Sequence, residues 1–176
     1  MTGSAKVNLG WLVSPPRPDG FHPVAGLVQT LSLHDTLTIT TGDPTDRPTA
    51  LVDGEPLTLS TTGPEASPAL DTEENLIVRA ARLVAGRTAP LPTTVALEKR
   101  IPVAAGLGGG SADAAAALVG LSAAWGAKRS VGALLDLGAR LGSDVPPILL
   151  GGLVAVSGKG ERVQGAGCGA GYAVVL

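Results

Sequence analysis

Residues 106–114 read GLGGGSADA, and a stretch rich in alanine and leucine follows them. Glycine allows the backbone to approach an anion closely, and the N–H groups at a helix N-terminus attract negative charge. The run therefore predicts a phosphate-binding loop, followed by a helix that starts at Ser111 with the serine side chain as its cap. A flexible loop before an alanine-rich helix is the alternative interpretation.

This run differs from two common phosphate-binding motifs. A Walker A loop requires a lysine directly before the serine, and Gly110 occupies that position. The dinucleotide-binding pattern GxGxxG requires a third glycine where Ser111 stands. The loop therefore belongs to neither motif.

Hydrophobic periodicity on both sides of the loop predicts a chain that mixes strands and helices. Alternation and continuous apolar runs predict strands, and a turn at 53–56 predicts a hairpin. Spacings of three and four residues, with capping residues and closing glycines, predict helices. The expected strands are 5–13, 24–33, 35–41, 93–97, 145–156 and 172–176, and the expected helices are 71–85, 111–125 and 130–141.

Length and composition exclude several classes of protein. A chain of 176 residues can bury a core of its own, and a net charge of −2 with 2% aromatic residues argues against nucleic-acid binding. One cysteine, Cys168, and two histidines argue against a zinc site. No apolar segment is long enough for a membrane span, and Met1 to Lys6 lacks the pattern of a secretory signal. We expect a cytoplasmic protein without a membrane or nucleic-acid partner; its oligomeric state is not predicted.

Two charged residues are candidates for catalysis. Asp144 stands in Gly142-Ser143-Asp144-Val145-Pro146, between the end of a predicted helix and a proline, where a carboxylate is rigidly placed to accept a hydroxyl proton. Lys6 lies within an apolar strand, on the same face as Asn8, and suits a developing negative charge. A turn-forming aspartate and a solvent-facing lysine are the structural alternatives.

A loop near the N-terminus carries a second candidate site. Residues 19–23 read DGFHP, which places the Phe21 ring beside the His22 imidazole, a pair suited to holding a planar base. The alternative is an ordinary turn with a packed phenylalanine. Lys99 and Arg100 could attract anions to the glycine loop, but a pair of solvated side chains is expected.

The order of these motifs resembles that of the GHMP kinase superfamily. The segments are 5–9 (AKVNL), 19–22 (DGFH), 75–77 (NLI), 102–115 and 142–146 (GSDVP), and the resemblance runs from about residue 4 to residue 163. Within the superfamily, the loop with its extra glycine and the DGFH segment are most similar to the kinases that phosphorylate 4-diphosphocytidyl-2-C-methyl-D-erythritol in non-mevalonate isoprenoid synthesis.

The resemblance implies an ATP-dependent kinase acting on the 2-hydroxyl of this cytidine diphosphate derivative. It assigns Asp144 as the base and Lys6 beside it, and it assigns the binding of the substrate's cytidine to Asn8, Phe21 and His22. Mg²⁺ is expected with ATP; its ligands are not identified, and the candidates are Ser111, Asp113 and the phosphates themselves. The residues assigned to ATP are Asn75, Pro102, Gly106, Leu107, Gly108, Gly109, Gly110 and Ser111.

The implied fold is a two-layer α+β domain with a mixed sheet, the amino-terminal lobe of such kinases. Residues 1–164 would form this ATP-binding domain, and 165–176 a linker and the start of a truncated carboxy-terminal domain, whose lobe is absent. The chain departs from the family pattern at Phe21, where tyrosine is usual, at Ala112, where a second serine is frequent, and in having about half the usual length.

Two other functions remain open from the sequence. One is a GHMP kinase that acts on a sugar, mevalonate or homoserine, which would show no preference for cytidine. The other is a non-catalytic nucleotide-binding fragment, which would bind ATP or cytidine without transferring phosphate. An unstable fragment with an exposed apolar face is a third outcome.

Overall fold

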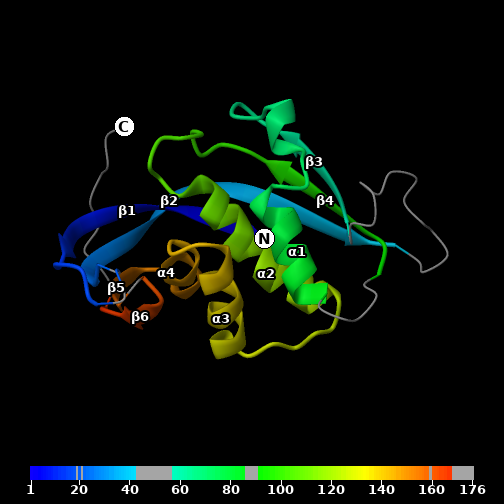
Figure 1. Ribbon diagram of the computed structural model, residues 1–176. Coiled ribbons are helices and arrows are strands. Elements are labelled where there is room, and N and C mark those ends of the chain that lie inside the picture. The colour runs from blue at the N-terminus through cyan, green and yellow to red at the C-terminus, as the bar shows by residue number, and fades with distance from the viewer. Residues whose placement is uncertain (19, 21, 43–56, 86–90, 159, 168–176) are drawn as a thin grey trace.

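The computed structural model describes residues 1–18, 20, 22–42, 57–85, 91–158 and 160–167. These residues form a mixed sheet with helices packed against it, so the expected α+β fold with a mixed sheet is confirmed (Figure 1). The strands are β1 (Thr2–Val13), β2 (Val24–Thr41), β3 (Thr58–Thr62), β4 (Thr93–Glu98), β5 (Leu153–Gly158) and β6 (Arg162–Gly165). The helices are the short 3₁₀ helix η1 (Pro68–Leu70), α1 (Leu76–Ala85), α2 (Gly109–Ala124), α3 (Val131–Leu141) and α4 (Val145–Leu150).

Strand β2 is the centre of the sheet. Its first part pairs with β5 and its last part with β4, while β1 runs antiparallel along its other edge. β3 pairs with β4 in parallel, and this parallel pair makes the sheet mixed. The sequence predicted two strands, 24–33 and 35–41; they form one strand because His34 stays in register with Ser4 of β1.

Helix α2 packs directly on the sheet because its contact residues are small. Six of its alanines and glycines are almost fully buried, and a side chain at Gly3 of β1 would lie 2.5 Å from the Ala112 carbonyl oxygen. The backbones of α2 and β1 therefore touch, which a larger residue at Gly3 would prevent. Helices α1, α3 and α4 complete this layer around α2 (Figure 1).

The predicted strand 145–156 is wrong, because its first half is helix α4. Pro146 and Pro147 occupy the first turn of α4, where the missing proline N–H costs nothing. Gly151 and Gly152, with φ of 69° and 71°, then turn the chain into β5. Periodicity does not separate a short buried helix from a buried strand, and both are continuous apolar runs.

Two helix starts also differ from expectation. Helix α2 begins at Gly109 with Gly108 as its N-cap, so Ser111 lies in the first turn and does not cap the helix. Helix α1 begins at Leu76 rather than near Asp71. Helix α3 begins at Val131, one residue after the expected start, with Ser130 as its N-cap.

Some predictions fall outside the described residues: the turn of the predicted hairpin at 53–56, the predicted helix stop at Gly86 and the predicted strand 172–176. In the part of the chain that is described, no helix is long and apolar enough to cross a membrane.

Candidate active site

Lys6 and Asp144, 138 positions apart in the sequence, meet in the structure. The Lys6 Nζ lies 3.3 Å from the Asp144 Oδ2, and the lysine side chain is 7% exposed against 38% for the aspartate. Asp144 directly precedes α4 but makes no side-chain capping bond to it. Its carboxylate therefore faces a buried cation and is open to solvent, which argues against a purely turn-forming role.

The glycine loop lies against Lys6. The Lys6 amide donates to the Leu107 carbonyl oxygen at 2.9 Å, and a side chain at Gly108 would come within 3.0 Å of the lysine Cε. Gly106 and Gly108 have φ of 76° and 71°, in the left-handed region that favours glycine. Both the backbone conformation and the closeness of Lys6 therefore favour glycine at position 108.

The N-terminus of α2 suits an anion. Within the helix, the first backbone hydrogen bond runs from the Ala112 amide to the Gly108 carbonyl oxygen, at 2.8 Å. The N–H groups of Gly109, Gly110 and Ser111 precede it and have no carbonyl partner in the helix. Together with the helix dipole, these groups can hold negatively charged oxygens beside Lys6 and Asp144.

A cavity of about 310 Å³ opens next to this helix end. Four residues predicted to bind ATP line it: Asn75, Pro102, Gly109 and Gly110. The other predicted loop residues, Gly106, Leu107, Gly108 and Ser111, are not part of its lining. The cavity therefore adjoins the first turn of α2, whereas Lys6 contacts the loop at Leu107 and Gly108.

Asn75 has a structural task in addition to lining the cavity. Its Oδ1 accepts a hydrogen bond from the Ile77 amide at 2.8 Å, and its Nδ2 donates to the Leu70 carbonyl oxygen at 2.7 Å. The side chain thus caps α1 and fastens it to η1. The assignment of Asn75 to ATP binding stays a prediction.

A buried charged cluster behind the loop was not predicted. The Lys99 Nζ forms an ion pair with Asp35 and another, at 3.0 Å, with the Asp113 Oδ2. The Asp35 Oδ1 also accepts from the amides of Arg100 and Ile101, at 2.5 and 2.8 Å. Lys99 and Asp113 are each 3% exposed and line the cavity, so the expectation of a solvated Lys99–Arg100 pair is wrong for Lys99.

Asp113 is the member of this cluster whose carboxylate lacks a hydrogen-bond partner on one oxygen. Its Oδ1 is buried and has no hydrogen-bond partner in the described part of the chain. Burial raises the pKa of its carboxyl from 3.8 to about 7; Lys99 opposes that rise and Asp35 adds to it. The cluster therefore changes charge near neutral pH.

Lys99 could have been found from the alternation of β4. Thr93, Val95 and Leu97 are buried, and two residues further along this face comes Lys99. Arg100, on the opposite face, is half exposed and pairs with Glu98 at 2.7 Å. The partners of Lys99 lie far away in sequence, so alternation predicts its burial but not its ion pairs.

The predicted substrate residues Asn8 and His22 do not lie side by side. The pairing register is unbroken from Lys6 to Asn8, so both side chains lie on one face of β1, and Asn8 is exposed. The His22 Nδ1 lies 3.0 Å from the carbonyl oxygen of Ser14. Ser14 is six residues after Asn8, a separation of about 20 Å at the rise of a strand. Phe21 lies outside the described residues.

The residues do not form a resident metal site. In the described ranges, no group of three His, Cys, Asp or Glu side chains could hold a metal ion. Asp113 does not fit Mg²⁺, because one of its carboxylate oxygens is paired with Lys99 and the other is buried, whereas Mg²⁺ retains several water ligands.

The chain is similar to known kinases. Residues 75–152 match the model of the GHMP kinases N terminal domain. Two proteins named 4-diphosphocytidyl-2-C-methyl-D-erythritol kinase, from Salinispora tropica and Pelotomaculum thermopropionicum, are 42% and 43% identical to it over 161 residues. These matches cover 91% of this chain and 47% and 52% of the two relatives, so the chain spans about half their length.

Solved structures show the same likeness. A crystal structure of 4-(cytidine 5'-diphospho)-2C-methyl-D-erythritol kinase superposes with a TM-score of 0.70 at 37% identity, covering 93% of this chain and 53% of that one. A mevalonate kinase from Methanococcus jannaschii superposes with a TM-score of 0.62 at 12% identity, over 93% of this chain and 54% of that one. The second likeness concerns the fold alone.

Proposed function

Since this chain belongs to the GHMP kinases, whose amino-terminal domain it carries, we propose that it phosphorylates the 2-hydroxyl of 4-diphosphocytidyl-2-C-methyl-D-erythritol with ATP. The observation that carries the proposal is the pairing of Lys6 with Asp144 beside the glycine loop. Residues 1–164 are then the ATP-binding domain. The likeness to relatives of that name supports the substrate.

In the proposed reaction, Asp144 acts as the base. Its carboxylate accepts the proton of the substrate hydroxyl while the hydroxyl oxygen forms a bond to the γ-phosphorus of ATP. The bond from the γ-phosphorus to the bridging oxygen breaks, and ADP leaves with that oxygen. The Lys6 ammonium, 3.3 Å from Asp144, offsets the negative charge that develops on the attacking oxygen.

The remaining residues bind and orient the reactants. The free N–H groups of α2 hold phosphate oxygens, and the cavity beside Asn75 and Pro102 holds the rest of the nucleotide. Mg²⁺ bound to the ATP phosphates would neutralise part of their charge, with the Ser111 hydroxyl at the start of α2 as a candidate ligand.

The substrate must be extended to contact all its assigned residues. Asn8 lies two residues after Lys6 on β1. The contact between His22 and Ser14 is about 20 Å from Asn8 in the direction of the strand. A ligand that places its hydroxyl at Lys6 and its base at His22 fits this separation, and Asn8 would then contact the end that carries the hydroxyl rather than the cytosine. The diphosphate of a cytidine diphosphate derivative supplies the length between the two ends.

Binding and transfer are tested separately. Calorimetric titration with the cytidine ligand, and with its uridine analogue as control, is expected to show binding of the first alone. Equal binding of the two would contradict the cytidine pocket and favour another GHMP kinase. Binding of ATP and the cytidine ligand with no transfer would favour the non-catalytic fragment.

The role of Asp144 has its own test. Asp144→Asn is expected to abolish transfer and to leave ATP affinity within about twofold, because the amide cannot accept the proton. A variant that still transfers phosphate would refute the base assignment. Asp136→Asn, a change of the same kind on the exposed surface of α3, is the control.

A further inference from the structure

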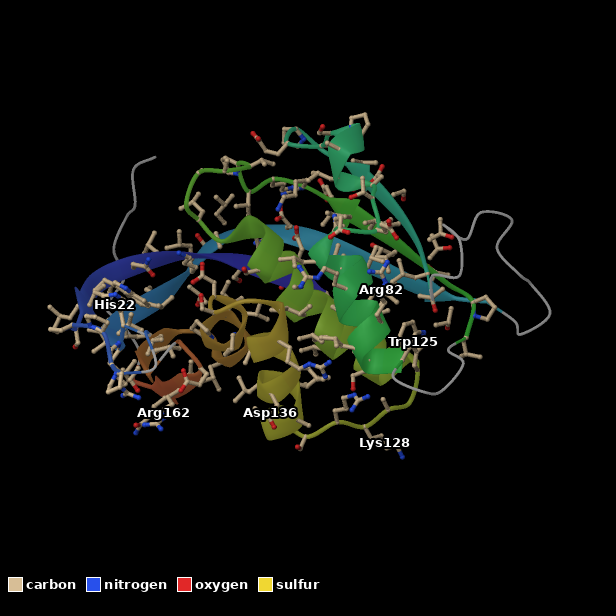
Figure 2. All side chains as sticks on the ribbon, in the orientation of Figure 1. His22, Arg82, Trp125, Lys128, Asp136 and Arg162 are labelled. Carbon is tan, nitrogen blue, oxygen red and sulfur yellow. The ribbon has the colours of Figure 1, made fainter. Side chains whose placement is uncertain are left out.

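A second pocket lies between α1 and α3. It has a volume of about 260 Å³ and is lined by Arg79, Arg82 and Leu83 of α1 and by Arg140 and Leu141 of α3. None of these residues lines the cavity beside the glycine loop. Figure 2 locates the two helices by Arg82 on α1 and Asp136 on α3.

The charges around this pocket are unbalanced. Arg82 forms an ion pair with Glu73 at 3.3 Å, between side chains that are 40% and 62% exposed. Among the described residues, the guanidinium groups of Arg79 and Arg140 contact no carboxylate. Asp136 stands one turn before Arg140 on α3, and no ion pair joins the two.

Three guanidinium groups around one pocket repel one another. Arg79 is also half-buried, so it has lost part of its hydration without gaining an acidic partner in the described chain. An anion between the three groups would offset both costs, and each guanidinium offers several N–H donors. The pocket therefore has the charge and the donors of an anion site, over a floor of two leucines.

We infer that the pocket between α1 and α3 binds the phosphate group of a compact ligand, at a site separate from the proposed kinase centre. Guanidinium groups match the oxygens of phosphate in pairs, and arginines from two helices can hold such a group from two sides. The volume is below that of a pocket for a drug-sized molecule, so the ligand is small.

Inorganic pyrophosphate is the probe for this site. Titration of the chain by calorimetry, in low-salt buffer without phosphate, is expected to show binding that weakens as NaCl is added. Arg140→Gln and Arg79→Gln should each weaken that binding about tenfold by removing charge-assisted hydrogen bonds. Arg162→Gln is the matched control, since Arg162 is 77% exposed on β6, away from both helices (Figure 2).

Each outcome decides the inference. Pyrophosphate bound at the glycine loop would be insensitive to Arg140→Gln and Arg79→Gln, so unchanged affinity in both variants overturns the site, as does no binding to the unmodified chain. Arg140 is exposed, so its variant decides alone if Arg79→Gln fails to fold. Malonate, a dicarboxylate of similar size, is expected to bind more weakly than pyrophosphate, and equal binding overturns the assignment to phosphate.

Discussion

Asp113 is expected to make the stability of this chain depend on pH. Its pKa rises from 3.8 to about 7 on folding, so between these values the folded chain holds a proton that the unfolded chain has released. The free energy of unfolding therefore falls as pH rises from 3.8 to 7 and is flat above 7. Each pH unit is worth about 1.4 kcal/mol, so the full loss is about 4 kcal/mol.

Asp113→Asn removes this dependence, because the amide has nearly the same shape and no charge to lose. Between pH 5 and pH 8 only the part up to pH 7 contributes, so the variant should gain about 3 kcal/mol relative to the unmodified chain. Urea unfolding at pH 5, 6, 7 and 8, followed by circular dichroism, measures the difference.

A comparison with exposed Asp136 isolates the effect. Asp136→Asn should follow the unmodified chain at every pH, since its side chain lies on the surface of α3 (Figure 2). A difference between Asp113→Asn and the unmodified chain that stays constant within about 0.5 kcal/mol from pH 5 to pH 8 would refute the reasoning. The Asp113 carboxyl would then be ionised in the folded chain, and its buried Oδ1 would need a partner that the described residues do not supply.

Three further substitutions test the site. Gly108→Ala should destabilise the chain by about 2 kcal/mol more than Gly106→Ala in urea unfolding. Both glycines have positive φ, but only a side chain at position 108 would lie against Lys6. Equal losses of stability would contradict that contact. Lys99→Met should lower the free energy of unfolding by about 3 to 5 kcal/mol, because it leaves Asp35 and Asp113 buried without a cation. Arg100→Gln should lower it by less than about 1 kcal/mol, because the pair of Arg100 with Glu98 is exposed. A small effect of Lys99→Met would show that the cluster reorganises. His22→Ala should weaken the cytidine ligand and leave ATP unchanged in calorimetry, and an equal loss for both would make His22 structural.

Sequence reasoning reached the elements with strong local signals. Helix α3 has a serine cap and a closing glycine, and β4 alternates strictly, so both were predicted nearly to the residue. Helix α4 was missed because a continuous apolar run fits a short buried helix and a buried strand equally well. The join of β2 at His34 depends instead on β1, which holds His34 in register with Ser4. Such contacts join residues too far apart for local periodicity to detect.

Only some residues of the candidate site were predicted from the sequence. The resemblance named Lys6 and Asp144, and the structure brings them within 3.3 Å. The cluster of Lys99 was missed because its carboxylates lie 64 residues before and 14 residues after it. Residue chemistry indicated what each group could do, whereas the distances between groups came only from the fold.

Strand β1 has a consequence for how the chain behaves in concentrated solution. In the described part of the chain it pairs only with β2, and on its other edge the Lys6 amide is bound to the Leu107 carbonyl oxygen. The part of this edge that can pair with a second chain therefore lies beyond Lys6, beside the exposed side chains of Leu9, Trp11, Leu12 and Val13. Such an edge is a template for aggregation by strand addition. Two irregularities in register, between Ser4 and Lys6 and between Asn8 and Gly10, interrupt it. The irregularity directly before Lys6 and the one after Asn8 therefore also limit how far a second chain can extend the sheet.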